Sequence, residues 1–142
     1  MNERGHAAVE FALAMGVLLL PAAIAVLSFG PWVQTRVEAE AIAAETARAA
    51  VLALSQPVAE SLAATMGEEL GFGSERMRLG WCDTAPVGVG EGTGSCPVLR
   101  GAAVSVTVQL WTPAITTPWG GVGGLWVTGE HAEPIDLYRS LP

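Results

Sequence analysis

The two cysteines are the residues of this chain whose type and spacing most directly suggest a chemical bond. Cys82 and Cys96 are separated by thirteen residues, which is too far for the CxxC pattern of a redox or zinc site. A disulfide between them would close a loop of about 15 residues and add roughly 3 kcal/mol to the free energy of unfolding. That bond needs an oxidising compartment, which means the outside of a membrane. The alternative is a pair of free thiols in a reducing cytosol.

The other reactive side chains do not form the pattern of a catalytic or metal site. His6 and His131 are the only histidines, and neither lies in an HExxH motif or near a cysteine. Glu68 and Glu69 are typical of a solvated helix end. The glycine-rich segment VGVGEGTG (87–94) fits neither the dinucleotide-binding nor the P-loop spacing. We therefore expect a protein that is not an enzyme and that has no cofactor and no metal.

Composition points toward a membrane and away from nucleic acid. The chain of 142 residues has fourteen acidic side chains against seven basic ones, all arginine, so it offers no basic surface to nucleic acid. It is 51% hydrophobic and only 15% charged, which is low charge for a soluble protein and usual for one that lies partly in lipid.

A long uncharged segment near the N-terminus predicts a membrane-spanning helix. No residue of 11–35 carries a formal charge. As a helix rising about 1.5 Å per residue, this segment exceeds the ~30 Å thickness of hydrocarbon, so it is either a span, at about residues 11–34, or a signal sequence. Trp32 lies where the apolar run ends, as a membrane-interface anchor would. Pro21 and Pro31 can each kink the helix.

Strong helix formers continue beyond this segment. Residues 8–55 predict one long helix, half in lipid and half outside it, because no glycine or proline occurs between Trp32 and Pro57. Glu45 and Arg48 are spaced to pair along it. Its second half is dense in alanine, and this small-residue surface either lets helices approach closely or only reflects helix propensity. One face of it carries Val37, Ala41, Ala44 and Val51.

A second helix and a sheet are expected in the rest of the chain. Residues 58–70 predict a helix that ends at Gly71, with Ser55 or Gln56 at its start and Pro57 at its first position. Segments 75–81 and 104–111 alternate apolar and polar side chains and predict half-buried antiparallel strands, with a third strand at about 125–129. The fold class is therefore α+β, with a long N-terminal transmembrane or pilin-like helix followed by a small head that contains a second helix and a short antiparallel sheet.

Three of the five tryptophans lie close to the turn-rich segment between the last two expected strands. They are Trp111, Trp119 and Trp126. We expect them to fill the core of the small head rather than to form a binding surface, and we expect Trp81 in the core as well.

The N-terminal segment resembles a known class of signal. Gly5, then HAAVE, then an uninterrupted hydrophobic helix resembles the class III signal of type IV pilin-like proteins. The segment GHAAVEFALAMGVLLLP, followed by the alanine-rich AIAAETARAA, is similar to the TadE-like minor pseudopilins of tight-adherence (Tad) pili, over about residues 4–52. The resemblance implies that a prepilin peptidase cuts between Gly5 and His6, which places Glu10 at the fifth position of the mature chain.

Glu10 raises an energetic question, because a carboxylate inside a span costs roughly 2.5–3.5 kcal/mol on insertion scales. The cleavage that the resemblance implies would expose an amine on His6. Pairing Glu10 of one subunit with the amine of its neighbour would remove two costly charges and set the register between subunits. The alternative is that Glu10 lies at headgroup level and needs no partner.

The resemblance implies a structural role and leaves two alternatives open. Residues 1–5 would be the leader, 6–56 the long helix, and 57–142 a head outside the cytoplasmic (inner) membrane. The protein would be a minor pilin subunit for assembly or priming of a Tad-type pilus, with other pilin subunits, the prepilin peptidase and membrane lipid as partners. One alternative is a soluble secreted domain released by cleavage after Ala25, and the other is an uncleaved single-span membrane protein.

Overall fold

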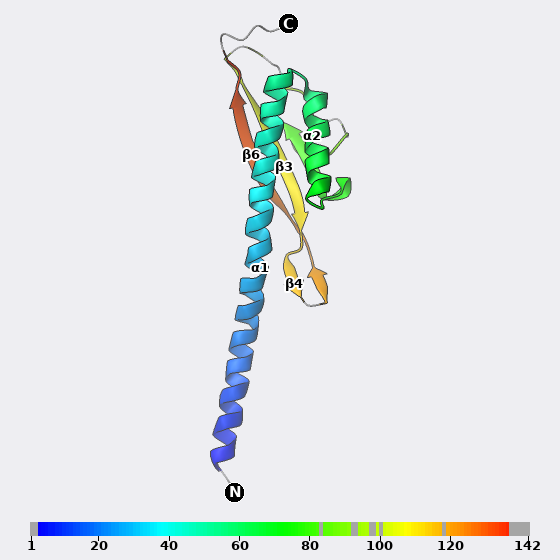
Figure 1. Ribbon diagram of the computed structural model, residues 1–142. Helices are drawn as coiled ribbons and strands as arrows, with labels where there is room; N and C mark the ends of the chain where they lie inside the picture. The colour runs from blue at the N-terminus through cyan, green and yellow to red at the C-terminus, as the bar shows by residue number, and fades with distance from the viewer. Residues whose placement is uncertain are drawn as a thin grey trace.

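One very long helix carries a small α+β head along its C-terminal half (Figure 1). The computed structural model describes residues 3–136 except 83, 92, 93, 97, 98, 100 and 118, and for 3–7, 28 and 116 it describes the backbone alone. The first two residues of the expected leader and residues 137–142 of the expected head lie outside the described part. The predicted fold class is confirmed.

Helix α1 runs from Glu3 to Ala53 as a single α-helix. Pro21 and Pro31 lie inside it without ending it. Each proline removes one backbone hydrogen bond, and the strong helix formers on both sides sustain the remaining turns. The helix ends where Leu54 adopts a left-handed φ of 51°. The predicted long helix is therefore confirmed, with its end two residues earlier than expected.

Helix α2 (Gln56–Glu69) packs beside the second half of α1 (Figure 1). Ser55 caps its start in an extended conformation, and Pro57 lies in its first turn, where a missing N–H costs nothing. After the C-cap residue Leu70, Gly71 has a φ of 86°, a conformation that glycine adopts without strain. The predicted second helix is confirmed, with Ser55 at the N-cap position as one of the two expected residues and Pro57 in its first turn.

The head contains a four-stranded antiparallel sheet in the order β2-β1-β3-β6. A short 3₁₀ turn (Ser74–Arg76) leads into it. Its strands are β1 (Met77–Trp81), β2 (Val87–Gly88), β3 (Ala103–Thr112) and β6 (Leu125–Pro134). Strand β6 is longer than the 125–129 expected, because it pairs with the full length of β3, from Ala103 opposite Pro134 to Thr112 opposite Leu125.

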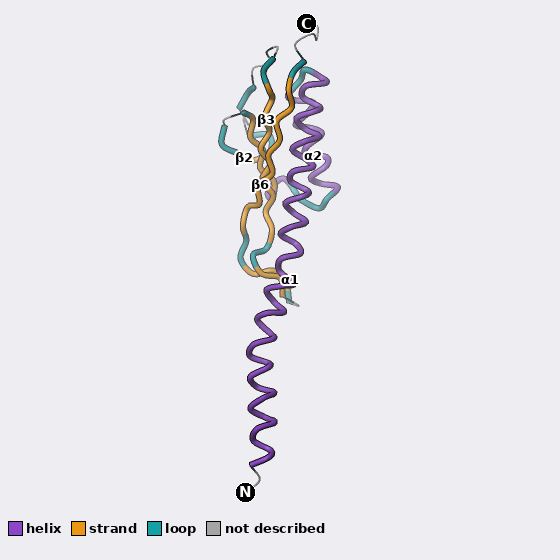
Figure 2. Tube along the Cα trace, turned by 90° about the vertical axis from the view of Figure 1, so that its left-hand side faces the viewer, coloured by secondary structure: helices purple, strands orange, loops and turns teal. Residues whose placement is uncertain are grey.

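Both helices cover the same face of this sheet, so the head has two layers (Figure 2). Helix α1 lies over β3 and β6, and α2 lies beside it over β1, where the Trp81 indole N–H donates to the Glu60 carboxylate at 3.0 Å. The inward side chains of the two predicted strands are buried, as their alternation indicated. They are Met77, Leu79 and Trp81 on β1 and Val104, Val106, Val108 and Leu110 on β3.

Small residues let α1 lie directly on the sheet. Gly129 of β6 faces the helix so closely that a Cβ atom there would collide with the backbone of Ala39 and Glu40. The face of α1 that packs on the head is rotated from the face with Val37 and Ala41, both of which are exposed. Val51, the last residue of the expected face, is buried. The buried residues of α1 are Thr35, Ala39, Ile42, Ala43, Thr46, Ala47, Ala50 and Val51.

A separate two-stranded hairpin, β4 (Ile115–Thr117) and β5 (Gly120–Val122), connects β3 to β6. It projects beyond the sheet and descends beside α1 toward the N-terminus of that helix (Figures 1 and 2). The Trp32 indole N–H donates to the Pro113 carbonyl at 3.0 Å, which fixes the base of the hairpin to the helix.

Candidate membrane and assembly site

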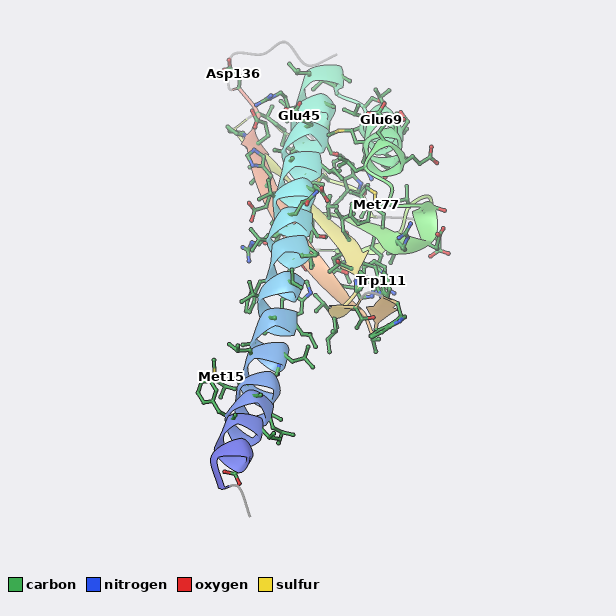
Figure 3. All side chains as sticks on the ribbon, turned by 60° about the horizontal axis from the view of Figure 1, so that its bottom comes forward. Met15, Glu45, Glu69, Met77, Trp111 and Asp136 are labelled. Atoms are coloured by element: carbon green, nitrogen blue, oxygen red, sulfur yellow. A yellow bond between two sulfur atoms is a disulfide. The ribbon has the colours of Figure 1, made fainter. Side chains whose placement is uncertain are left out.

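The first half of α1, residues 8–30, is exposed to its surroundings and is called the bare half below. Every residue of 8–30 whose side chain is described is exposed, and Figure 3 shows Met15 projecting from this part of the helix, far from the head. The segment is long and apolar enough to cross a membrane, and none of its most apolar stretch is buried within the structure. Its largest exposed side chains include Phe11, Val17, Leu18, Leu20, Leu27 and Phe29.

The predicted processing and register residues lie together at the far end of this bare half. Gly5 and His6 belong to the first turns of α1, and Glu10 follows on an exposed position of the same helix. From Glu10 to Arg36 the helix carries no other charged residue. Cleavage beside Gly5 and pairing of Glu10 stay predictions.

Trp32 marks the boundary between the bare and the packed half of α1. Its ring is half-buried, and its centroid lies 5.6 Å from that of Phe29. Its N–H is already used by the Pro113 carbonyl, so the residue joins the helix to the head as well as ending the apolar run. The predicted role of Trp32 as a membrane-interface anchor remains a prediction, and the bond to Pro113 was not foreseen.

The disulfide between Cys82 and Cys96 is present, with their Cα atoms 5.7 Å apart. It joins the end of β1 to the segment that precedes β3. The Gln56 amide donates to the Gly94 carbonyl at 2.6 Å, which also ties this loop to the start of α2. The bond therefore closes the part of the head remote from the bare helix.

Few side chains that could bind a metal or act in catalysis lie close together in the described part of the chain. No group of three or more His, Cys, Asp or Glu side chains in this part of the chain could hold a metal ion. A hollow of about 450 Å³ on the open face of the sheet is lined by Cys82, Ser105 and His131 among others, with the cysteine held in its disulfide. The His131 Nε2 atom lies 3.3 Å from a Glu133 carboxylate oxygen. That the protein is not an enzyme stays an expectation.

The expectation that Trp111, Trp119 and Trp126 fill the core is wrong for Trp119, and Trp111 and Trp126 lie outside the core cluster of the described residues. This side chain is 93% exposed, at the turn of the β4–β5 hairpin, because the hairpin projects beyond the sheet and α2 (Figure 1). Trp111 and Trp126 are half-buried, and the Arg78 guanidinium lies 4.1 Å from the centre of the Trp126 ring. Trp81 is fully buried, as expected.

Comparison with known proteins found no matching family model, no matching curated protein and no matching solved structure.

Proposed function

We propose that this protein is a pilin-like structural subunit of the TadE-like kind, held in the cytoplasmic membrane by the first half of α1 until it joins or primes a Tad-type pilus. The observation that carries the proposal is the division of one continuous helix. Its first half exposes an unbroken apolar surface, and its second half is built into a disulfide-closed head. A subunit of a helical filament needs both parts, one to pack among neighbouring helices and one to face outward.

The exposed apolar surface is stable only if lipid or protein keeps it away from water. Full burial of a leucine or phenylalanine side chain is worth about 1.5–3 kcal/mol, and the bare half exposes many such side chains. A surface of this extent on a soluble monomer would cause association. Lipid covers it before assembly in this proposal, and the equivalent helices of neighbouring subunits cover it afterwards.

Glu10 would supply the register between those helices. It stands at one end of the bare half with no other charged residue before Arg36. An amine created by cleavage before His6 would lie four residues away along the chain, about 6 Å along a helix axis. A neighbouring subunit shifted along the axis by a short distance would bring its Glu10 to that amine, which neutralises both charges in an apolar surrounding.

The first test is the intact mass and N-terminal sequence of the protein isolated from its own cell envelope. The expected chain begins at His6. A chain that begins at Val26 would mean a secreted domain whose Glu10 was discarded with its leader. A chain that retains Met1 would mean an uncleaved membrane anchor. Either of these two results overturns the proposal.

The second test replaces Glu10 by alanine. Because breaking a buried ion pair costs about 3–5 kcal/mol, we expect E10A to insert normally and to lower the yield of assembled filament at least about tenfold. E45A is the matched control, since Glu45 lies on the packed half of the same helix and forms an exposed pair with Arg48 at 3.0 Å. Equal filament yields from E10A, E45A and the unaltered chain would remove the register role.

A further inference from the structure

We infer that the β4–β5 hairpin is a second membrane-contacting element, and that phospholipid of the outer leaflet occupies the groove between this hairpin and α1. The inference rests on the part of the proposed function that puts the first half of α1 in a bilayer. It does not depend on assembly of a pilus.

The described residues that line the groove are apolar. It has a volume of about 360 Å³ and lies between the first half of α1 and the first strand of the hairpin. Its lining residues are Pro21, Ile24, Ala25, Phe29, Trp32 and Ile115. A hollow without a single charged side chain, open on a helix that spans a bilayer, suits an acyl chain better than water.

The depth of the hairpin along α1 supports the same occupant. About 20 helical residues cross the hydrocarbon core, so a span that starts after Glu10 ends near residue 30, next to Trp32. Ile115 of the hairpin lines the groove together with Phe29 and Trp32, so the first strand of the hairpin lies against α1 at about the level where the span ends.

The hairpin has the chemistry of a segment that enters the headgroup region. Trp119 at its turn is 93% exposed, and the neighbouring Val122 and Ile115 are 59% and 44% exposed. Tryptophan is the side chain most favoured at this depth of a bilayer. The two strands pair with each other, and the Thr117 hydroxyl donates to the Gly120 carbonyl at 2.6 Å, so these polar groups carry their own hydrogen bonds into a poorly hydrated region.

This contact would fix the head relative to the membrane surface. The hairpin is held to α1 through Trp32 and Pro113, and it is continuous with β3 and β6 of the sheet. Lipid on one side of it and the helix on the other would hold the head upright over the span. The head is already built on the second half of α1, so this contact adds a second attachment at the membrane surface.

The experiment uses the full chain reconstituted in phosphatidylcholine vesicles, part of whose lipid carries bromine on the acyl chains. Bromine quenches the fluorescence of a tryptophan that it touches. The readout is the loss of tryptophan emission relative to vesicles without bromine, for the unaltered chain and for W119F, W32F and W126F. Trp126 is the matched control, because it lies on the open face of the sheet against Arg78.

We expect W119F and W32F each to remove roughly half of the quenched emission, since these are the two tryptophans placed at the interface, and W126F to change nothing. W119F should fold normally, because its side chain is almost fully exposed. If W32F lowers the quenching but W119F does not, the inference is overturned and the membrane span stands. Access of iodide to Trp119 would then indicate water, and protection from iodide would indicate a second copy of the chain. No quenching of any variant would overturn the membrane span as well.

Discussion

The two halves of α1 are similar in local sequence preference and opposite in surroundings. In the first half Val17 and Leu18 are 70% and 68% exposed, whereas in the second half Ile42 and Ala43 are fully buried. One unbroken helix contains both halves, although Pro21 and Pro31 lie inside it, so the continuity of the helix says nothing about burial. The halves differ because only the second half packs against the sheet.

Helix α1 therefore has two roles, and each half contributes to a different free energy. The second half stabilises the head, because its small face packs against β3, β6 and α2. The first half contributes no described contact to the core cluster, and the contacts that it makes with the hairpin lie outside that cluster. Substitutions in the two halves should therefore change different measurements.

The largest expected effect comes from shortening a side chain in the packed half. Ile42→Ala removes a fully buried side chain from the core between α1 and the sheet. We expect it to lower the free energy of unfolding by about 2–5 kcal/mol, measured by chemical denaturation followed by near-UV circular dichroism. Leu27→Ala in the bare half is the control, since that side chain is 68% exposed, and it should leave the unfolding of the head unchanged. Equal losses from the two variants would show that both halves of α1 stabilise the head.

Breaking the disulfide should affect the head by a similar amount. We expect the double variant C82S/C96S to lose about 3 kcal/mol, because the bond closes a loop of about 15 residues and limits the unfolded chain. The measurement is the same denaturation, together with the rate of proteolysis within residues 82–96. S95A is the control, since it alters an exposed hydroxyl beside Cys96 and keeps the bond. An unchanged midpoint would show that the packing of α1 and α2 holds the loop without help from the disulfide.

The sequence predicted the elements better than it predicted how they pack. Alternation identified β1 and β3, and the lack of glycine and proline identified the second half of α1. The packed face of α1 could not be found in this way, because alanine occurs on every side of the helix and Ala41 differs from Ala43 in no local property. That choice depends on Gly129, a residue of β6 far along the chain that leaves room for the helix backbone.

The candidate site could also be predicted only in part from the sequence. Gly5, His6 and Glu10 could be proposed from the N-terminal segment, since they form a local motif. The position of the β4–β5 hairpin could not, because its depth along α1 depends on the lengths of β3 and β6 and on the bond from Trp32 to Pro113. For the same reason Trp119 was expected in the core and is instead exposed.

A smaller effect should follow from adding one methyl group at the contact between α1 and the sheet. In Gly129→Ala the new Cβ collides with the backbone at Ala39 and Glu40, so the helix must shift away from β6. Overpacking of this kind costs about 1–3 kcal/mol. Gly30→Ala is the control, because a Cβ there meets nothing within 4 Å and alanine favours the helix. A G129A chain as stable as G30A would mean that α1 does not lie against β6 as described.

The smallest predicted effect is a gain in stability in the packed half. Thr46 is fully buried there, and its hydroxyl has no hydrogen-bond partner among the described residues. A buried hydroxyl without a partner carries a desolvation cost of about 1–3 kcal/mol, and valine has nearly the same shape without that group. We therefore expect Thr46→Val to raise the free energy of unfolding by about 1 kcal/mol, measured by chemical denaturation. Thr65→Val is the control, because that exposed hydroxyl donates to the Ser61 carbonyl at 2.9 Å, and it should gain nothing. A loss of stability in T46V would mean that the hydroxyl meets a partner in the folded protein, and the packed half would then be held by a polar contact as well as by its small apolar face.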